Sequence, residues 1–143
     1  MPFGDSIVRT FFVLYTVDVV NQSGVAAEAI EIEDRVSLGL LGPIGGDLFI
    51  AEAPFEIPPG ASRDPVQFTP VPPAAEFTVT LPELAANAGA QIRFWAVVQT
   101  FVPASSGNAD ASALLINRAE IIAQGPDTNS ADNTVEIHTP LVP

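Results

Sequence analysis

Hydrophobic and polar residues alternate along most of this chain, with the two-residue period of a β-strand that buries one face. The alternation is clearest in seven segments, which span residues 15–21, 27–34, 47–51, 76–81, 90–102, 113–123 and 133–139. In the fifth segment Ile92 and Phe94 share one face, while Trp95 and Val97 share the other. No window places its apolar residues along one face of a helix. An all-β fold is therefore expected.

Turn-forming residues separate these segments. Clusters rich in Gly, Pro, Asn and Asp occupy residues 21–24, 42–46, 58–63, 70–74 and 125–133, and a further turn is expected within residues 81–90. Many short strands joined by such turns are typical of β-sandwiches. The pattern predicts an immunoglobulin-like, antiparallel two-sheet sandwich of seven to eight strands, with an extended N-terminal strand.

The stretch from residue 53 to residue 75 is the least regular part of the chain and contains seven prolines. Proline cannot donate a hydrogen bond to a sheet ladder, so it is confined to loops and edge strands. We expect this stretch to cover the open edge of a sheet. The alternative is a loop that presents a ligand-binding surface.

The N-terminal segment is apolar on both faces and runs into the first strand without a turn residue. Its candidate assembly residues are Ile7, Val8, Phe11, Phe12, Val13 and Leu14. About 15 extended residues reach roughly 50 Å, which exceeds a usual strand. Part of the segment is therefore expected to overhang the sheet or to change partners.

An overhanging apolar strand aggregates unless something covers it. This predicts that residues 1–14 form an assembly strand that inserts into a groove of a neighbouring copy, by donor-strand addition, and that residues 15–143 form the sandwich domain. The alternative is an ordinary first strand that switches sheets through a bulge within one sandwich.

Two segments carry a resemblance to a known family. YTVDVVNQSGVAAEAIEIEDRV, residues 15–36, and NRAEIIAQGPDTNSADNTVEIHT, residues 117–139, resemble the opening and closing hairpins of the bacterial and archaeal surface repeat called domain of unknown function 11. In the first hairpin, Asn21 and Gly24 suit a chain reversal and Asp34 suits a strand end. The resemblance implies an immunoglobulin-like fold, a place in a cell-surface protein and no catalytic activity. Residues 37–75 depart from the pattern of the repeat.

The charge balance excludes several classes of partner. Among 143 residues there are 17 acidic and 5 basic ones, all five basic residues are arginines, and the net charge is −12. Such a chain repels the nucleic-acid backbone and anionic membrane surfaces, so neither is an expected partner. No apolar run is long enough to span a bilayer, so no membrane insertion is expected. There is no cysteine, which excludes disulfides and thiolate chemistry.

The chain offers few parts for catalysis or metal binding, and no catalytic residue is predicted. His138 is the only histidine, and its place in a strand favours an ordinary surface position. No cofactor is expected apart from calcium, for which Asp127, Asn129 and Asp132 are candidate ligands in a short oxygen-rich loop. Hydrogen bonding to the local backbone is the alternative explanation of that loop.

Two further features concern glycans. Asn21-Gln22-Ser23 is the only N-glycosylation sequon and lies at a predicted turn. Trp95, with Tyr15 and Phe101, is a candidate aromatic platform for a bound sugar, although Trp95 equally suits a core or a subunit interface.

Taken together, these features predict a non-enzymatic structural subunit of an extracellular filament or cell-surface layer. Its expected partners are other copies of itself, which assemble head-to-tail by N-terminal strand donation. The alternatives are a monomeric surface or adhesin module and a glycan- or calcium-binding module.

Overall fold

A computed structural model describes residues 6–22, 24–41, 44–70, 72–103, 112–123 and 134–141. These residues form nine β-strands: β1 (Ser6–Val20), β2 (Ala27–Leu41), β3 (Gly45–Glu56), β4 (Ser62–Arg63), β5 (Gln67–Pro70), β6 (Pro73–Leu84), β7 (Gly89–Pro103), β8 (Ser112–Ala123) and β9 (Thr134–Leu141). Within the described residues, no helix is long and apolar enough to cross a membrane.

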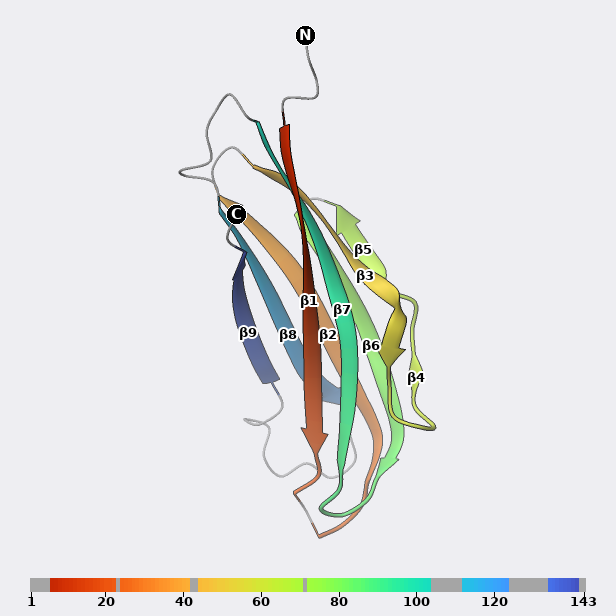
Figure 1. The fold of residues 1–143 in the computed structure, drawn as a ribbon. Coiled ribbons are helices and arrows are strands. Elements are labelled where there is room, and N and C mark those ends of the chain that lie inside the picture. Colours follow the sequence, from red (N-terminus) through yellow and green to blue (C-terminus); the bar gives the residue numbers. More distant parts are fainter. Residues whose placement is uncertain are drawn as a thin grey trace.

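The strands form two antiparallel sheets that pack face to face (Figure 1). Sheet A has three strands in the order β1-β7-β3, and sheet B has the order β4-β6-β2-β8-β9, with β5 also paired to β6. The chain crosses between the sheets at most of its connections, as two-sheet antiparallel sandwiches require. The predicted all-β sandwich is confirmed, and its arrangement is compatible with an immunoglobulin-like fold.

Alternate residues of both sheets fill the space between them. Ile92, Phe94, Ala96 and Val98 of β7 are all buried, as are Ile30 and Ile32 of β2 and Phe77 and Val79 of β6. Four aromatic rings contact one another at the centre, since Phe94 lies 5.6 Å from Tyr15, 5.6 Å from Phe55 and 5.0 Å from Phe77 between ring centroids. One core therefore joins the two sheets.

β1 pairs with β7 along its whole length. Fifteen consecutive residues of β1 pair with β7, from Ser6 opposite Pro103 to Val20 opposite Gly89, without a register shift. The expectation that part of this segment overhangs or changes partners is wrong, because β7 is equally long. β1 is an ordinary first strand within one sandwich, as the alternative expects, but it has no bulge and does not switch sheets. Residues 6–14 continue directly into residues 15–20 within this one strand.

The proline-rich stretch lies at the edge of sheet B, as predicted. β4 and β5 each pair with β6 and with no other strand, so they follow one another along the same edge. The end of β3 also belongs to this stretch, and its pairing with β7 shifts register between Ile50 and Phe55. Pro54 lies within that irregularity, where a missing backbone donor is tolerated.

Candidate assembly surface

Apolar side chains from all three strands gather on the outer face of sheet A. We call this surface the apolar face. It consists of Val8, Phe12 and Leu14 of β1, Trp95, Val97 and Phe101 of β7, and Phe49 of β3. Phe12 is 67% exposed, Val8 54%, Phe49 42% and Leu14 38%, whereas Trp95, Val97 and Phe101 are partly covered by their neighbours.

Strand register brings these side chains into rows across the sheet. Phe12 lies opposite Val97, which on its other side lies opposite Phe49. Directly opposed residues of antiparallel strands share a face and touch, so each row forms one continuous surface. Leu14 with Trp95 and Val8 with Phe101 form the neighbouring apolar rows. One polar row, which ends at Asp47 on β3, separates the row of Val8 and Phe101 from the row of Phe12, Val97 and Phe49.

The six candidate assembly residues divide between the two faces of β1. Phe11 and Val13 point inward and pack against the core. The outward-pointing ones are Val8, Phe12 and Leu14, which belong to the apolar face. The backbone of Ile7 pairs with Val102. Apolar residues on both faces of this segment therefore have two separate roles, since one set stabilises the core and the other set remains exposed.

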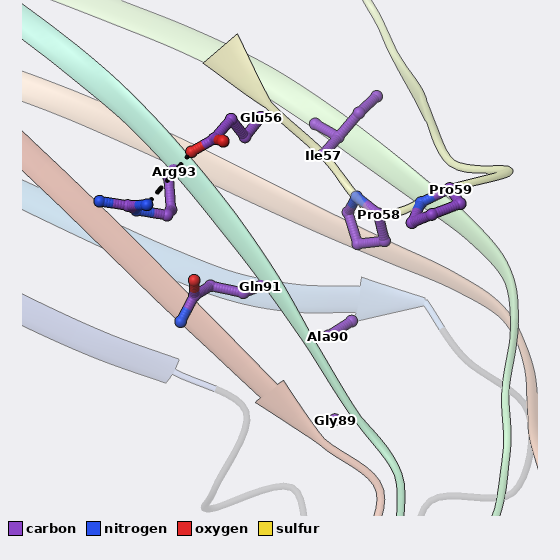
Figure 2. Close-up of a pocket in the computed structure, with 8 residues that line it drawn as sticks. All are labelled: Glu56, Ile57, Pro58, Pro59, Gly89, Ala90, Gln91 and Arg93. Carbon is purple, nitrogen blue, oxygen red and sulfur yellow. Dashed lines mark ion pairs between the residues drawn. The ribbon is translucent and has the colours of Figure 1, made fainter. Parts of the chain in front are cut away.

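An open hollow of about 380 Å³ adjoins the apolar face where β3 ends and β7 begins. Figure 2 shows Arg93 and Gln91 on one side of it and Pro58 and Pro59 on the other. Arg93 forms an exposed ion pair with Glu56, with 3.3 Å between Nη1 and Oε2. The hollow does not combine an acid, a base and a nucleophile as a catalytic site would. We therefore regard it as the polar rim of the apolar face.

The outer face of sheet B has the opposite character. It carries ion pairs between Arg35 and Glu76, at 3.3 Å, and between Arg118 and Glu120, at 3.1 Å. Exposed pairs of this kind contribute little to stability, but they keep a sheet face hydrated. Strands of sheet B also expose Leu41, Ile122 and Val135. The outer face of sheet A differs in that its row of Phe12, Val97 and Phe49 contains no charged residue.

A group of polar side chains is buried between the sheets. Asp34 of β2 is only 1% exposed and Asn117 of β8 only 3%. Both carboxyl oxygens of Asp34, the Oδ1 atom of Asn117 and the hydroxyl of Tyr15 are buried and form no hydrogen bond of good geometry. Asp34 shares a strand face with Ile32 and Val36, so the expectation that it ends a strand is wrong.

Burial raises the pKa of Asp34 to about 8, and the nearby Asn117 side chain lowers this pKa only in part. Burial likewise raises the pKa of Tyr15, the hydroxyl of Thr139 lowers it, and the charge of Asp34 raises it. Asp34 is consequently mostly protonated at neutral pH, because an isolated carboxylate is strongly disfavoured in a nonpolar interior.

Tyr15 and Trp95 lie on opposite faces of sheet A. Tyr15 is 4% exposed and packs against Phe94 in the core, whereas Trp95 and Phe101 belong to the apolar face. The sugar platform predicted from Trp95, Tyr15 and Phe101 is therefore wrong as a set. On the outer surface Trp95 lies one row from the exposed Phe12, whereas the polar row through Gln99 separates Phe101 from Phe12.

Asn21 anchors the loop that follows β1. Its Nδ2 atom donates to the carbonyl oxygens of Val25, Leu84 and Ala85, at 2.8, 3.0 and 3.2 Å, and its backbone N–H donates to Ala88. The residue is only 9% exposed. A glycan would be attached to this same nitrogen, so glycosylation of Asn21 would disrupt these hydrogen bonds. Glycosylation here stays a prediction.

Replacing Asn21 with alanine is expected to lower the free energy of unfolding by about 2 kcal/mol, because buried carbonyl groups lose their donor. Urea denaturation measures this change. Ser23→Ala is the matched control, since it abolishes the sequon and keeps the amide. Equal losses from both variants would show that the sequon, rather than the amide, stabilises the protein.

The remaining candidate residues are at the surface or beyond the described part. Asp127, Asn129 and Asp132 lie outside the described residues, so calcium binding there stays a prediction. Among the residues that are described, no three His, Asp or Glu side chains are grouped as a metal site. His138 is exposed on β9 and contacts Glu136, which confirms its predicted surface position.

Comparisons with protein families, curated proteins and solved structures give no significant match to this chain. Functional interpretation therefore depends on the surfaces described above.

Proposed function

We propose that this protein is a non-enzymatic structural subunit of an extracellular filament or cell-surface layer. In this proposal copies assemble head-to-tail, and β1 of one copy takes the position beside β7 of the next. An open chain of such exchanges forms a filament, because each copy both donates and accepts one strand. The partners are other copies of the same chain.

The pairing of β1 is the observation that carries this proposal. β1 is the terminal strand of sheet A, and among the described strands it pairs only with β7. Its inward side chains, which include Phe11 and Val13, pack against the core from that edge. A neighbouring copy can supply the same strand in the same register, so exchange preserves the pairing of β1 with β7. It requires that the connection between β1 and β2 opens, which breaks the hydrogen bond from Asn21 to Val25.

Two further features support an extracellular structural role. The net charge of −12 favours solubility and tolerance of salt. The segments at residues 15–36 and 117–139 resemble a microbial surface repeat. The second segment forms the predicted antiparallel pair, β8 with β9, but the first is not a hairpin, because β1 and β2 belong to different sheets. The protein's single histidine is exposed on β9 and contacts Glu136, as an ordinary surface residue would.

A glycan-binding module is the second candidate function. The observation that favours it is the exposed aromatic surface formed by Phe12, Phe49 and the partly covered Trp95. Sugar rings stack on such aromatic side chains, and Arg93 and Gln91 at the rim supply hydrogen-bond donors.

A paired cysteine variant tests strand donation. Thr10 and Gln99 lie directly opposite one another on β1 and β7, at a separation that suits a disulfide. The natural chain has no cysteine, so Thr10→Cys with Gln99→Cys forms the only possible bridge. Oxidation of assembled protein is expected to give a ladder of covalent multimers on a non-reducing denaturing gel, because β1 and β7 then belong to different copies.

The matched control is Glu33→Cys with Glu120→Cys, a directly opposed pair on β2 and β8. These strands are not exchanged, so its disulfide forms within one chain and the gel shows monomer. A monomer band from both variants, under conditions where electron microscopy shows filaments, would eliminate strand donation as the means of assembly.

A further inference from the structure

The apolar face is a second surface that strand donation leaves exposed. Exchange of β1 between copies rebuilds the same sheet A, so Phe12, Leu14 and Phe49 remain on its outer side. We propose that this face pairs with the same face of a second copy, in a face-to-face contact between two A sheets. This contact is independent of strand donation and forms equally between copies whose β1 strands are not exchanged.

The size of the apolar face fits a contact between two folded chains. Its exposed side chains present on the order of 400 Å² of nonpolar surface, which is in the range where large patches on single chains are functional. A stable interface covers roughly 800 Å² on each partner. The apolar face provides the centre of such an interface, and the adjoining hollow and polar residues provide its rim.

The charges of the surface favour a second copy as the occupant. The centre of the face, formed by Phe12, Val97 and Phe49, contains no charged residue. Two chains that each carry a net charge of −12 can therefore approach here without bringing like charges together at the centre. The ion pair of Arg93 with Glu56 lies at the rim, and Asp47 lies beside Phe49 at the edge-strand end of the polar row.

The shape of the surface also fits another sheet. A three-stranded antiparallel face with side chains in cross-strand rows packs on a second sheet about 10 Å away, as the two sheets of a sandwich do. A contact between identical faces uses the same residues twice around a two-fold axis. The outer face of sheet B cannot take this role, because its ion pairs would lose their hydration.

The only tryptophan of the chain reports directly on this contact. Trp95 lies in the apolar face, opposite Leu14, and is partly exposed in the single chain. Pairing of two faces removes water from its ring, so its fluorescence emission is expected to shift to shorter wavelength as protein concentration rises. Sedimentation equilibrium over the same concentrations is expected to show a reversible dimer. Strand exchange alone leaves the surroundings of Trp95 unchanged.

Two substitutions test the contact from different strands. Phe12→Glu on β1 and Phe49→Glu on β3 each place a charge at the centre of the face, and each is expected to weaken association roughly 100-fold. Phe68→Glu is the matched control, because Phe68 is 51% exposed on β5, outside the apolar face. Circular dichroism checks that every variant keeps its fold. Because the two substitutions lie on different strands, one variant still tests the contact if the other fails to fold.

Several results would overturn the proposal. One is a monomer at every concentration, and another is association that neither Phe12→Glu nor Phe49→Glu weakens. Binding of monomers to phosphatidylcholine vesicles or to a glucan oligosaccharide through Trp95, without self-association, would assign the face to a different occupant. A ladder from the paired cysteine variant without a shift in Trp95 emission refutes face pairing alone, and a shift without a ladder refutes strand donation alone.

Discussion

Replacing Asp34 with asparagine is expected to stabilise the protein at pH 8 by about 5 kcal/mol, with a much smaller effect near pH 4. The carboxyl of Asp34 is almost fully buried and forms no hydrogen bond of good geometry in the described part of the structure. Asparagine has a nearly identical shape and carries no ionisable group. The substitution therefore removes the free energy that burial of this carboxyl requires once the unfolded chain can ionise.

The direction of the pH dependence follows from the two pKa values. The ordinary pKa of the aspartate side chain is 3.8, and burial raises the pKa of Asp34 in the folded protein to about 8. Below the lower value, both states are protonated and the group does not oppose folding. As pH rises between the two values, only the unfolded chain ionises, so the free energy of unfolding falls by about 1.4 kcal/mol per pH unit. Above the higher value no further loss occurs.

Urea denaturation of the wild type and of Asp34→Asn, across this pH interval, measures the effect. The difference between the two curves isolates the contribution of Asp34. Asp47→Asn removes the same charge from an exposed position and serves as the control. Parallel curves for wild type and Asp34→Asn would mean that the buried carboxyl is already ionised or is hydrated.

The strands themselves could be predicted from the sequence because alternation reports which face of a strand is buried. The segment predicted as residues 90–102 is observed as Gly89–Pro103, and the other six segments each overlap an observed strand. Alternation does not indicate which strands pair with one another. The pairing of β1 with β7 joins residues that are far apart in the sequence, and their equal length could not be recognised from either segment alone.

The candidate surfaces were harder to predict, for two physical reasons. In β7 both faces are apolar, so periodicity separates Phe94 from Trp95 but cannot say which of the two meets the core. The prediction that Asp34 ends a strand is wrong for the opposite reason, because it rests on the residue type and not on the position in the strand. Its place between Ile32 and Val36 in the alternation was the signal that indicated burial.

Replacing Phe94 with alanine is expected to lower the free energy of unfolding by about 3–5 kcal/mol, which is a large part of the stability of an ordinary domain. Phe94 is fully buried, and its ring contacts Tyr15 of β1, Phe55 of β3 and Phe77 of β6. Truncation leaves a cavity between the two sheets, and neighbours held by sheet hydrogen bonds can fill it only in part. Urea denaturation monitored by circular dichroism measures the loss.

Phe68→Ala is the control for this change, because Phe68 is half exposed on edge strand β5, and its expected loss is below about 1 kcal/mol. Comparable losses from both variants would mean that the sheets do not share one tight core. A rigid core has a direct consequence for assembly, because it fixes both the site beside β7 that accepts β1 and the rows of the apolar face. Destabilisation by Phe94→Ala should therefore be accompanied by weaker self-association, even though Phe94 lies on the opposite face of β7 from Trp95 and touches no partner.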